Sequence, residues 1–425
     1  MSAFAHESDS QSPPLPEQVT LIHAGTLLIN AAAPPRTRQT LRIEGTRIKS
    51  VSDGILAPEE LGLAPENTET IELLDRFVMP GLIDAHVHLT LSPEREANRF
   101  ETTGEEMLIE GIVNAGRTLR AGFTTVRDLG ARPYSWPIIV LRDAIAEGRI
   151  DGPRMLVAGG SISATGGHAD ILGRPEKIAS RLDTPGVCDG VAACRKAVRG
   201  QFRQGADLVK INATGGGGER NGGKDDPPAF LSDELLALVE TARSLRLKVA
   251  AHAHGTAGIN AALEAGADSI EHGSFLDEAS IALFLDRGAF LVPTLSVQDV
   301  IAKEVGGAEG PMRSRMRDFL RHHPENVGSA YRAGVRIALG TDAGVVPHGQ
   351  NARELEWLVK VGMTNADAIR AATTEAAELL GLADDAGSLE PGRLADVIAV
   401  RGDPLADIGA LREVTFVMKA GRVQR

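Results

Sequence analysis

Two histidines that follow an apolar stretch have the spacing of a metal-ligand pair. Residues 77–83 are apolar, and Asp84, His86 and His88 come directly after them. Side chains two residues apart on a β-strand point to the same side, so both imidazoles can reach one ion. Imidazole suits zinc and similar divalent ions. Taken alone, however, a His-x-His pair is weak evidence of a metal site, and a local accident of a buried strand explains it better.

Further candidate ligands follow other short apolar runs. Lys210 lies in "DLVKINATGGGG", His252 and His254 end "KVAAHAH", His272 ends "SIEH", and Asp342 follows "ALGT". With His86 and His88, five of the 11 histidines therefore stand at the ends of β-like runs. Imidazoles, a carboxylate and an open position for water are what a catalytic zinc-type site needs. We therefore interpret these residues as one metal site rather than as separate buried polar groups.

The elements that must position these residues alternate between β-like and helix-like segments. Alternation of this kind predicts parallel strands, and eight units predict a (β/α)8 TIM barrel, whose catalytic residues lie at the carboxyl ends of the strands. An open doubly wound sheet is the alternative, but no GxGxxG follows the first strand. The eight runs are "FVMPGLIDAHVH", "TTVRDLG", "RMLVAGG", "LVKINA", "KVAAHAH", "SIEHG", "FLVPTL" and "RIALGTDAG".

Both ends of the chain differ from this middle part. Short alternating runs with Gly, Pro and Asn turns predict β-structure in each. We expect a flexible extension at 1–18, a small β-sandwich domain made from 19–78 and 386–425, and the barrel at 79–385. Late in the barrel, residues 364–381 predict one helix, with a capping box of Thr364 and Asp367 and a stop at Gly381.

Composition excludes several classes of protein. The net charge of −12 provides no general attraction for nucleic acid or anionic membranes. No apolar run reaches the about 18 residues of a membrane span. The two cysteines, Cys188 and Cys194, are expected to be free thiols. The polar N-terminus lacks a signal pattern, so a cytoplasmic protein is expected, with a signal peptide already removed as the alternative.

Several motifs together resemble the metal-dependent amidohydrolase superfamily. They are "PGLIDAHVHL", "GFTTVRDLG", "GADLVKI", "VAAHAHG", "SIEHGS", "ALGTDAG" and the tail "AGSLEPGRLADVIAVRGDPL". The resemblance extends over residues 20 to 425. Within the superfamily, the chain is most similar to the imidazolonepropionase-like group, which includes Xaa-Pro dipeptidases and ochratoxin-hydrolysing amidases.

The resemblance implies two divalent ions, most simply zinc, and a carbamate formed from CO2 on Lys210 that bridges them. It assigns His252 rather than His254 as the ligand on that strand. Asp342 would be both a ligand and the base that takes the proton of the attacking water, and His168 would hydrogen-bond the substrate carbonyl. If Lys210 were not a ligand, one metal would suffice. The implied metal ligands are His86, His88, Lys210, His252, His272 and Asp342.

Other residues near these positions are expected to contact substrate or support the ligands. Thr214 and His254 are candidate substrate contacts, and residues 214–218, four of them glycines, predict a mobile active-site loop. Glu271 is expected to point away from the metals into an ion pair of the barrel wall. Residues 230–232 are Phe-Leu-Ser where the dipeptidases would have a tyrosine for the substrate carboxylate. That departure favours a bulkier, more apolar substrate.

The leading hypothesis is a binuclear amidohydrolase that cuts an amide to a carboxylate-bearing amino acid. Substrate candidates are N-acyl amino acids, dipeptides ending in Pro or an aromatic residue, and ochratoxin A. Two alternatives are a cyclic-amide hydrolase of imidazolonepropionase type, with one metal, and a non-catalytic binding protein on the same fold. The resemblance also implies a homo-oligomer, as large as an octamer.

Overall fold

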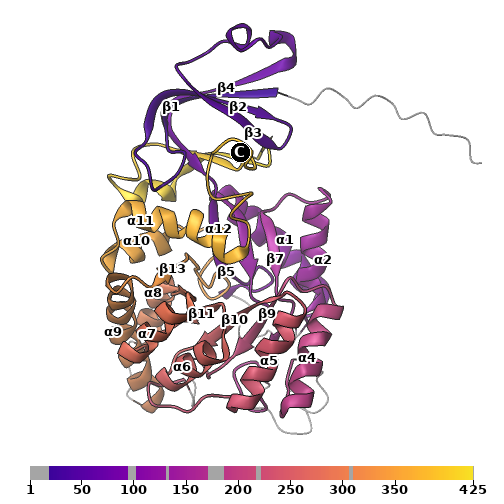
Figure 1. Ribbon diagram of the computed structural model, residues 1–425, viewed down its shortest axis with the longest axis vertical. Helices are drawn as coiled ribbons and strands as arrows, with labels where there is room; N and C mark the ends of the chain where they lie inside the picture. The colour runs from indigo at the N-terminus through magenta and orange to yellow at the C-terminus, as the bar shows by residue number, and fades with distance from the viewer. Residues whose placement is uncertain are drawn as a thin grey trace, which may run out of the picture.

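The chain folds into a barrel with a smaller β-domain at one end (Figure 1). The computed structural model describes residues 19–93, 102–130, 134–170, 186–216, 222–305 and 310–424. The expected N-terminal extension, 1–18, lies outside the described residues, as do residues 217 and 218 of the glycine-rich loop.

The small domain is built from both ends of the chain, as the sequence predicts. Its seven-stranded mixed sheet has the order β16-β15-β14-β4-β1-β2-β3. The two chain ends meet where β4 pairs antiparallel with β14, and a separate apolar core lies against the sheet. The strands are β1 (Val19–Leu27), β2 (Arg36–Glu44), β3 (Arg47–Asp53), β4 (Thr68–Pro80), β14 (Val397–Val400), β15 (Val414–Lys419) and β16 (Arg422–Val423).

The eight predicted barrel strands are all present, and neighbouring strands run parallel. One seam closes through hydrogen bonds such as Ala85 N to Leu339 O, at 2.8 Å, and the other through Asp207 N to Val157 O, also 2.8 Å. The TIM barrel is therefore confirmed. Its strands are β5 (Leu82–Val87), β6 (Phe123–Asp128), β7 (Arg154–Val157), β9 (Leu208–Asn212), β10 (Lys248–Ala253), β11 (Ser269–His272), β12 (Phe290–Val292) and β13 (Arg336–Ile337), with the short β8 (Ser161–Ile162) paired to β9.

Helices surround these strands (Figure 1). Strands buried on both faces need continuous apolar sequence, and every residue of β5, β6 and β9 is buried. The helices are α1 (Gly104–Arg120), α2 (Trp136–Ala146), α4 (Val191–Arg203), α5 (Ser232–Ser244), α6 (Thr256–Ala265), α7 (Glu278–Arg287), α8 (Gln298–Glu304), α9 (Pro311–Arg332), α10 (Arg353–Lys360), α11 (Asn365–Ala371) and α12 (Thr374–Leu380), with short 3-10 turns η1 (Pro58–Leu61), η2 (Pro65–Asn67), η4 (Leu295–Val297) and η5 (Ile408–Arg412).

Two sequence expectations about elements are wrong in detail. The first apolar run is not one strand, because it divides at Gly81 into β4 of the small domain and β5 of the barrel. A Cβ at Gly81 would lie 2.3 Å from Thr124 Oγ1, so only glycine fits this crossing between domains. The single helix expected at 364–381 is two helices, α11 and α12, although Thr364 caps the first and Gly381 ends the second.

The break between α11 and α12 has a cause in the barrel. The carbonyls of Ala371 and Ala372 accept hydrogen bonds from Leu339 N, at 2.9 Å, and Ile83 N, at 2.8 Å. Carbonyls that point at strand amides outside the helix are directed away from the amides of the next helical turn. Thr373, with φ −132° and ψ −94°, therefore leaves the helical conformation.

The expectation of two free thiols is also wrong, because Cys188 and Cys194 form a disulfide. Gly190, at φ 77°, reverses the chain just before α4. The reversal brings the two Cα atoms to 5.1 Å, within the range of disulfides. A six-residue spacing alone does not reveal such a turn.

Within the described residues, no helix has both the length and the apolar character that crossing a bilayer requires. The homo-oligomer and the cytoplasmic location stay predictions.

Candidate metal centre

The strand ends named from the sequence converge on one cavity of about 220 Å³ at the mouth of the barrel. All six implied metal ligands line it, together with His168 and His254. They come from β5, β9, β10, β11 and the segments that follow β8 and β13. Residues far apart in sequence therefore form one polar site, as the positions of strand ends in a barrel require.

One group of candidate ligands comes from the ends of β5 and β11 and from the segment after β13. Asp342 Oδ1 lies 3.2 Å from His88 Nε2 and 3.5 Å from His86 Nε2. His86, His272 and Asp342 each offer a ligand atom, and these atoms lie within 4.8 Å of one another. Asp342 is held there because its amide donates to His86 O at 2.8 Å.

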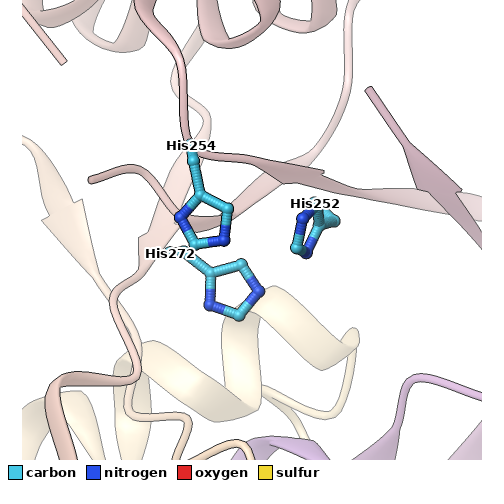
Figure 2. A group of neighbouring side chains, drawn as sticks. All are labelled: His252, His254 and His272. Atoms are coloured by element: carbon cyan, nitrogen blue, oxygen red, sulfur yellow. The ribbon is translucent and has the colours of Figure 1, made fainter. Parts of the chain in front are cut away.

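A second group consists of three histidines, His252, His254 and His272, from β10 and β11 (Figure 2). The His254 and His272 rings stack at 4.7 Å, while His252 stands edge-on to both. Ligand atoms of all three lie within 4.8 Å of one another. His254 therefore also offers a nitrogen that could bind a shared ion. The choice of His252 rather than His254 as the ligand stays a prediction.

Lys210 is the unusual member of the cavity wall. Its side chain is only 3% exposed, and within the described residues Nζ has no hydrogen-bond partner. Burial lowers the lysine pKa to about 8. A buried amine without a partner costs free energy unless something else satisfies it, such as a ligand or a covalent modification.

The protonation states also suit cations. Burial, followed by the charge of Lys210, lowers the pKa of His86 to about 4. Burial likewise lowers the pKa of His252 and His272 well below the usual value. Although burial opposes its ionisation, the neighbouring His86 and His88 hold the pKa of Asp342 below the usual range. For His88, burial is outweighed by the hydrogen bond to Asp342, which raises the pKa of this histidine. Neutral imidazoles and an ionised carboxylate are the states that bind divalent ions, so His86, His252, His272 and Asp342 fit a metal centre.

Groups behind the cavity hold two of the histidines in place. His86 Nδ1 lies 2.8 Å from Glu271 Oε2, and His272 Nδ1 lies 2.7 Å from Thr294 Oγ1. Arg127 Nη2 donates to the other oxygen of Glu271, at 2.8 Å. Glu271 thus lies in the expected ion pair of the barrel wall and also orients His86. Such second partners fix the tautomer and raise the basicity of a metal-binding imidazole.

Replacing Glu271 by Gln is expected to weaken metal binding by about 10- to 100-fold. A Gln amide has one oxygen and one NH2 group, so its NH2 would face either His86 Nδ1–H or Arg127, and one donor would oppose another. The measurement is metal retention against increasing chelator, with Tm recorded in parallel. Glu375→Gln is the matched control, since Glu375 pairs with Arg336 at 2.7 Å outside the cavity. Equal chelator resistance in both variants would contradict the role of Glu271.

Three residues at these strand ends have left-handed backbone angles although none is glycine. They are His272 at φ 70°, Thr294 at φ 53° and Asp342 at φ 58°. Such angles are costly for side chains other than Asn and Asp, and they concentrate at functional sites. His272 is the last residue of β11, whereas Thr294 and Asp342 follow β12 and β13, so the chain turns sharply at the ends of these strands, where two proposed ligands lie.

The predicted substrate contacts have different surroundings. His168 lines the cavity, with its ring stacked on His252 at 4.5 Å. Thr214 is fully buried and is not part of the lining; its Oγ1 accepts from His254 N at 3.0 Å, and its substrate role stays a prediction. Phe230 lies in the main apolar core, away from the cavity.

One wall of the cavity was not foreseen from the sequence. It is apolar and comes from the segments after β5, β12 and β13 and from α8 and α9. The one sequence signal for this wall is the helical spacing of apolar residues after the seventh strand. Any helix that packs against a barrel has such spacing, so it does not identify a cavity wall. The wall consists of Leu91, Val297, Ile301, Phe319 and Val345.

Comparisons with known proteins agree with this geometry. The sequence profile of the amidohydrolase family matches residues 77–424. Ochratoxinase from Aspergillus niger is 34% identical over 433 residues, 96% of this chain and 86% of that protein. Imidazolonepropionase from Mesorhizobium japonicum is 26% identical over 359 residues, 79% of this chain and 80% of that protein.

Solved structures show the same fold over nearly the whole chain. A Xaa-Pro dipeptidase with bound methionine in the active site has a TM-score of 0.87 and 36% identity, covering 95% of this chain and 99% of that one. The A. niger ochratoxinase crystal structure has a TM-score of 0.84 and 32% identity, covering 96% of each.

A metal-binding constellation at the mouth of a TIM barrel, with a β-domain from both chain ends, defines a class of hydrolase, and this chain belongs to the amidohydrolase family. It is a hydrolase that acts on carbon–nitrogen bonds, related to ochratoxinase and to Xaa-Pro dipeptidases.

Proposed function

We propose that the protein uses two divalent metal ions, most simply zinc, to hydrolyse an amide bond to a carboxylate-bearing amino acid. The observation that carries this proposal is the buried Lys210 amine without a partner, in one cavity with several imidazoles and Asp342. His86, His88 and Asp342 would hold one ion, His252 and His272 the other, and a carbamate on Lys210 both.

When bound, the ions would polarise the scissile carbonyl and acidify the attacking water. The Asp342 carboxylate would accept the proton of that water and transfer it to the leaving nitrogen, which must be protonated before it departs. His168 would donate a hydrogen bond to the carbonyl oxygen as that oxygen gains negative charge. The stacking of His168 on His252 restricts its ring orientation, which favours such a fixed donor.

The apolar wall supports a substrate with a bulky apolar group. Val297, Ile301 and Phe319 line the same cavity as the polar ligands and would offer an aromatic ring or a proline a place away from water. Two similar proteins support a substrate of this kind, since one is an ochratoxinase and the other a Xaa-Pro dipeptidase. We therefore propose N-acyl amino acids, dipeptides ending in Pro or an aromatic residue, and ochratoxin A as the substrates to test.

A second candidate is a cyclic amide, because an imidazolonepropionase is also similar to this chain. That chemistry would need one metal, and Lys210 would then stay an unmodified amine. The buried, unpartnered Nζ of Lys210 favours the two-metal proposal.

The test is a substrate screen on the chain reconstituted with zinc or cobalt. We expect kcat/KM for a C-terminal Phe to exceed that for Gly by at least about tenfold, because burying an aromatic side chain contributes about 1.5–3 kcal/mol. Chelator treatment should abolish the activity, and zinc should restore it. Turnover confined to cyclic amides, with one metal per chain, would instead support the second candidate.

A further inference from the structure

A second and larger cavity, of about 630 Å³, lies between the barrel and the small β-domain. Four arginines and one acidic residue contribute to its lining. Arg117 and Arg120 stand in the last turn of α1, which packs against β15 of the small domain. Arg401 follows β14, and Arg412 ends η5. We call this cavity the arginine groove; none of its lining residues lines the metal centre.

The groove concentrates positive charge on an acidic protein. The chain carries a net charge of −12, yet the groove lining has four arginines against the single carboxylate of Glu413. Arg412 is neutralised from outside by Glu356. Arg117 bonds only the neutral amide oxygen of Asn114, at 3.2 Å, among the contacts of the described chain. Arg401 has no ion pair or hydrogen bond within the described ranges.

Helix electrostatics explain only part of this cluster. Arginines in the last turn of a helix are favoured by its negative end, which accounts for Arg117 and Arg120. Arg401 and Arg412 come from the other end of the chain and belong to no α-helix. Folding therefore brings like charges together from separate segments. Like charges repel each other unless an anion or solvent compensates them.

A buried histidine in the wall adds an independent observation. His348 is 8% exposed, and its Nε2 lies 3.0 Å from Leu91 O. A carbonyl can only accept, so Nε2 carries the hydrogen, and in the neutral ring Nδ1 is an acceptor. Within the described residues, this buried Nδ1 has no partner. It would be satisfied by a ligand that carries an O–H group.

We propose that the arginine groove binds a small phosphate monoester. The guanidinium fork matches two oxygens of a phosphate, and several forks around one hollow match a doubly charged group. A hydroxyl on the organic portion of such an ester would donate to His348 Nδ1, because a doubly charged phosphate group carries no O–H of its own. The volume exceeds that of a bare phosphate and leaves room for an organic portion, as in other small-molecule sites. This site is separate from the proposed amide hydrolysis and does not depend on it.

The groove also borders a segment that reaches the metal centre. His348 belongs to the segment between Asp342 and Asn351, and Asn351 Nδ2 donates to Asp84 Oδ2 at 2.7 Å. Asp84 in turn accepts from Thr341 Oγ1 at 2.7 Å, beside Asp342. Asp84 therefore holds both ends of the segment that carries Asp342, and a ligand in the groove would contact the same segment at His348.

The test is titration calorimetry of the metal-loaded full chain with glycerol 2-phosphate, at an ionic strength held constant with KCl. We expect saturable binding that the double variant Arg117→Ala/Arg401→Ala weakens at least tenfold. Arg203→Ala is the matched control, because Arg203 is an exposed arginine in the last turn of α4 and should leave binding unchanged. Glycerol at the same concentration should give no binding heat.

Phosphate could also bind at the metal centre, and the variants separate the two sites. Binding that persists unchanged in the double variant would overturn the proposal and place the anion at the metals. If the double variant fails to fold by circular dichroism, Arg117→Lys/Arg401→Lys decides, because it keeps the charge and loses the fork. At least threefold weaker binding in that variant supports the groove, and unchanged binding contradicts it.

Discussion

Replacing Asp342 by Asn is expected to lower kcat by about 10²- to 10⁴-fold, the range of contributions from general acid–base catalysis. Asparagine has nearly the same shape and keeps one oxygen that can bind a metal, but it cannot take a proton from water. The backbone should tolerate the change, because Asp342 has a φ of 58° and Asn adopts such angles as readily as Asp. The substitution therefore removes the proposed base with little disturbance to the fold.

Kinetics and metal analysis together distinguish the roles of Asp342. If it acts as the base, kcat falls while the Kd of substrate and the metal content per chain stay close to those of the parent protein. A variant that loses metal would show that Asp342 acts chiefly as a ligand. If turnover survives the change with metal in place, another group must be the base.

The barrel and the proposed ligands could be predicted because both depend on local patterns. Eight apolar runs mark the strands, and His86, His88, His252 and His272 lie at or next to their ends. In a parallel barrel the carboxyl ends of all strands meet at one face, so position along a strand is enough to bring residues together. No knowledge of loop conformation is needed for that step.

Features that depend on contacts between distant segments could not be predicted in this way. The break at Thr373 arises because strand amides take the carbonyls of Ala371 and Ala372. The sequence places Arg127 in a predicted strand but does not show that its guanidinium contacts Glu271. Its one sequence signal is a charged side chain within a buried strand, which requires a partner.

The apolar wall of the cavity likewise could not be predicted from the sequence. Phe319 lies in α9, a helix of 22 residues, and the sequence pattern of that helix does not say which residue faces the cavity. The rings of His254 and Phe319 lie edge to face with centroids 5.6 Å apart, so the wall touches His254, a proposed substrate contact. Under the proposed function, substrate specificity would therefore depend on helix and loop placement, and the metal chemistry on the strand ends.

Replacing Lys210 by Met is expected to reduce bound metal from two ions per chain to one or none and to abolish turnover. The reason lies in the state of the amine. A pKa of about 8 leaves about one Lys210 in ten neutral at pH 7, whereas an ordinary lysine is neutral in on the order of one in 2,500. The neutral amine can attack CO2, forming a C–N bond and releasing one proton, and the product carries anionic oxygens. Methionine has a similar length but cannot form this group.

Lys248→Met is the control for loss of a lysine on the neighbouring strand, where Lys248 is partly buried. Lys248 Nζ donates to Leu379 O at 2.5 Å and so supports the end of α12 instead of the cavity. Its removal should lower Tm but leave two metals bound. Incubation with ¹³C-bicarbonate adds a direct readout, because the parent protein and Lys248→Met should give a carbamate ¹³C signal that Lys210→Met lacks. Two tightly bound metals in Lys210→Met, or no carbamate signal in the parent protein, would show that Lys210 stays an unmodified amine and that the centre needs another bridging group.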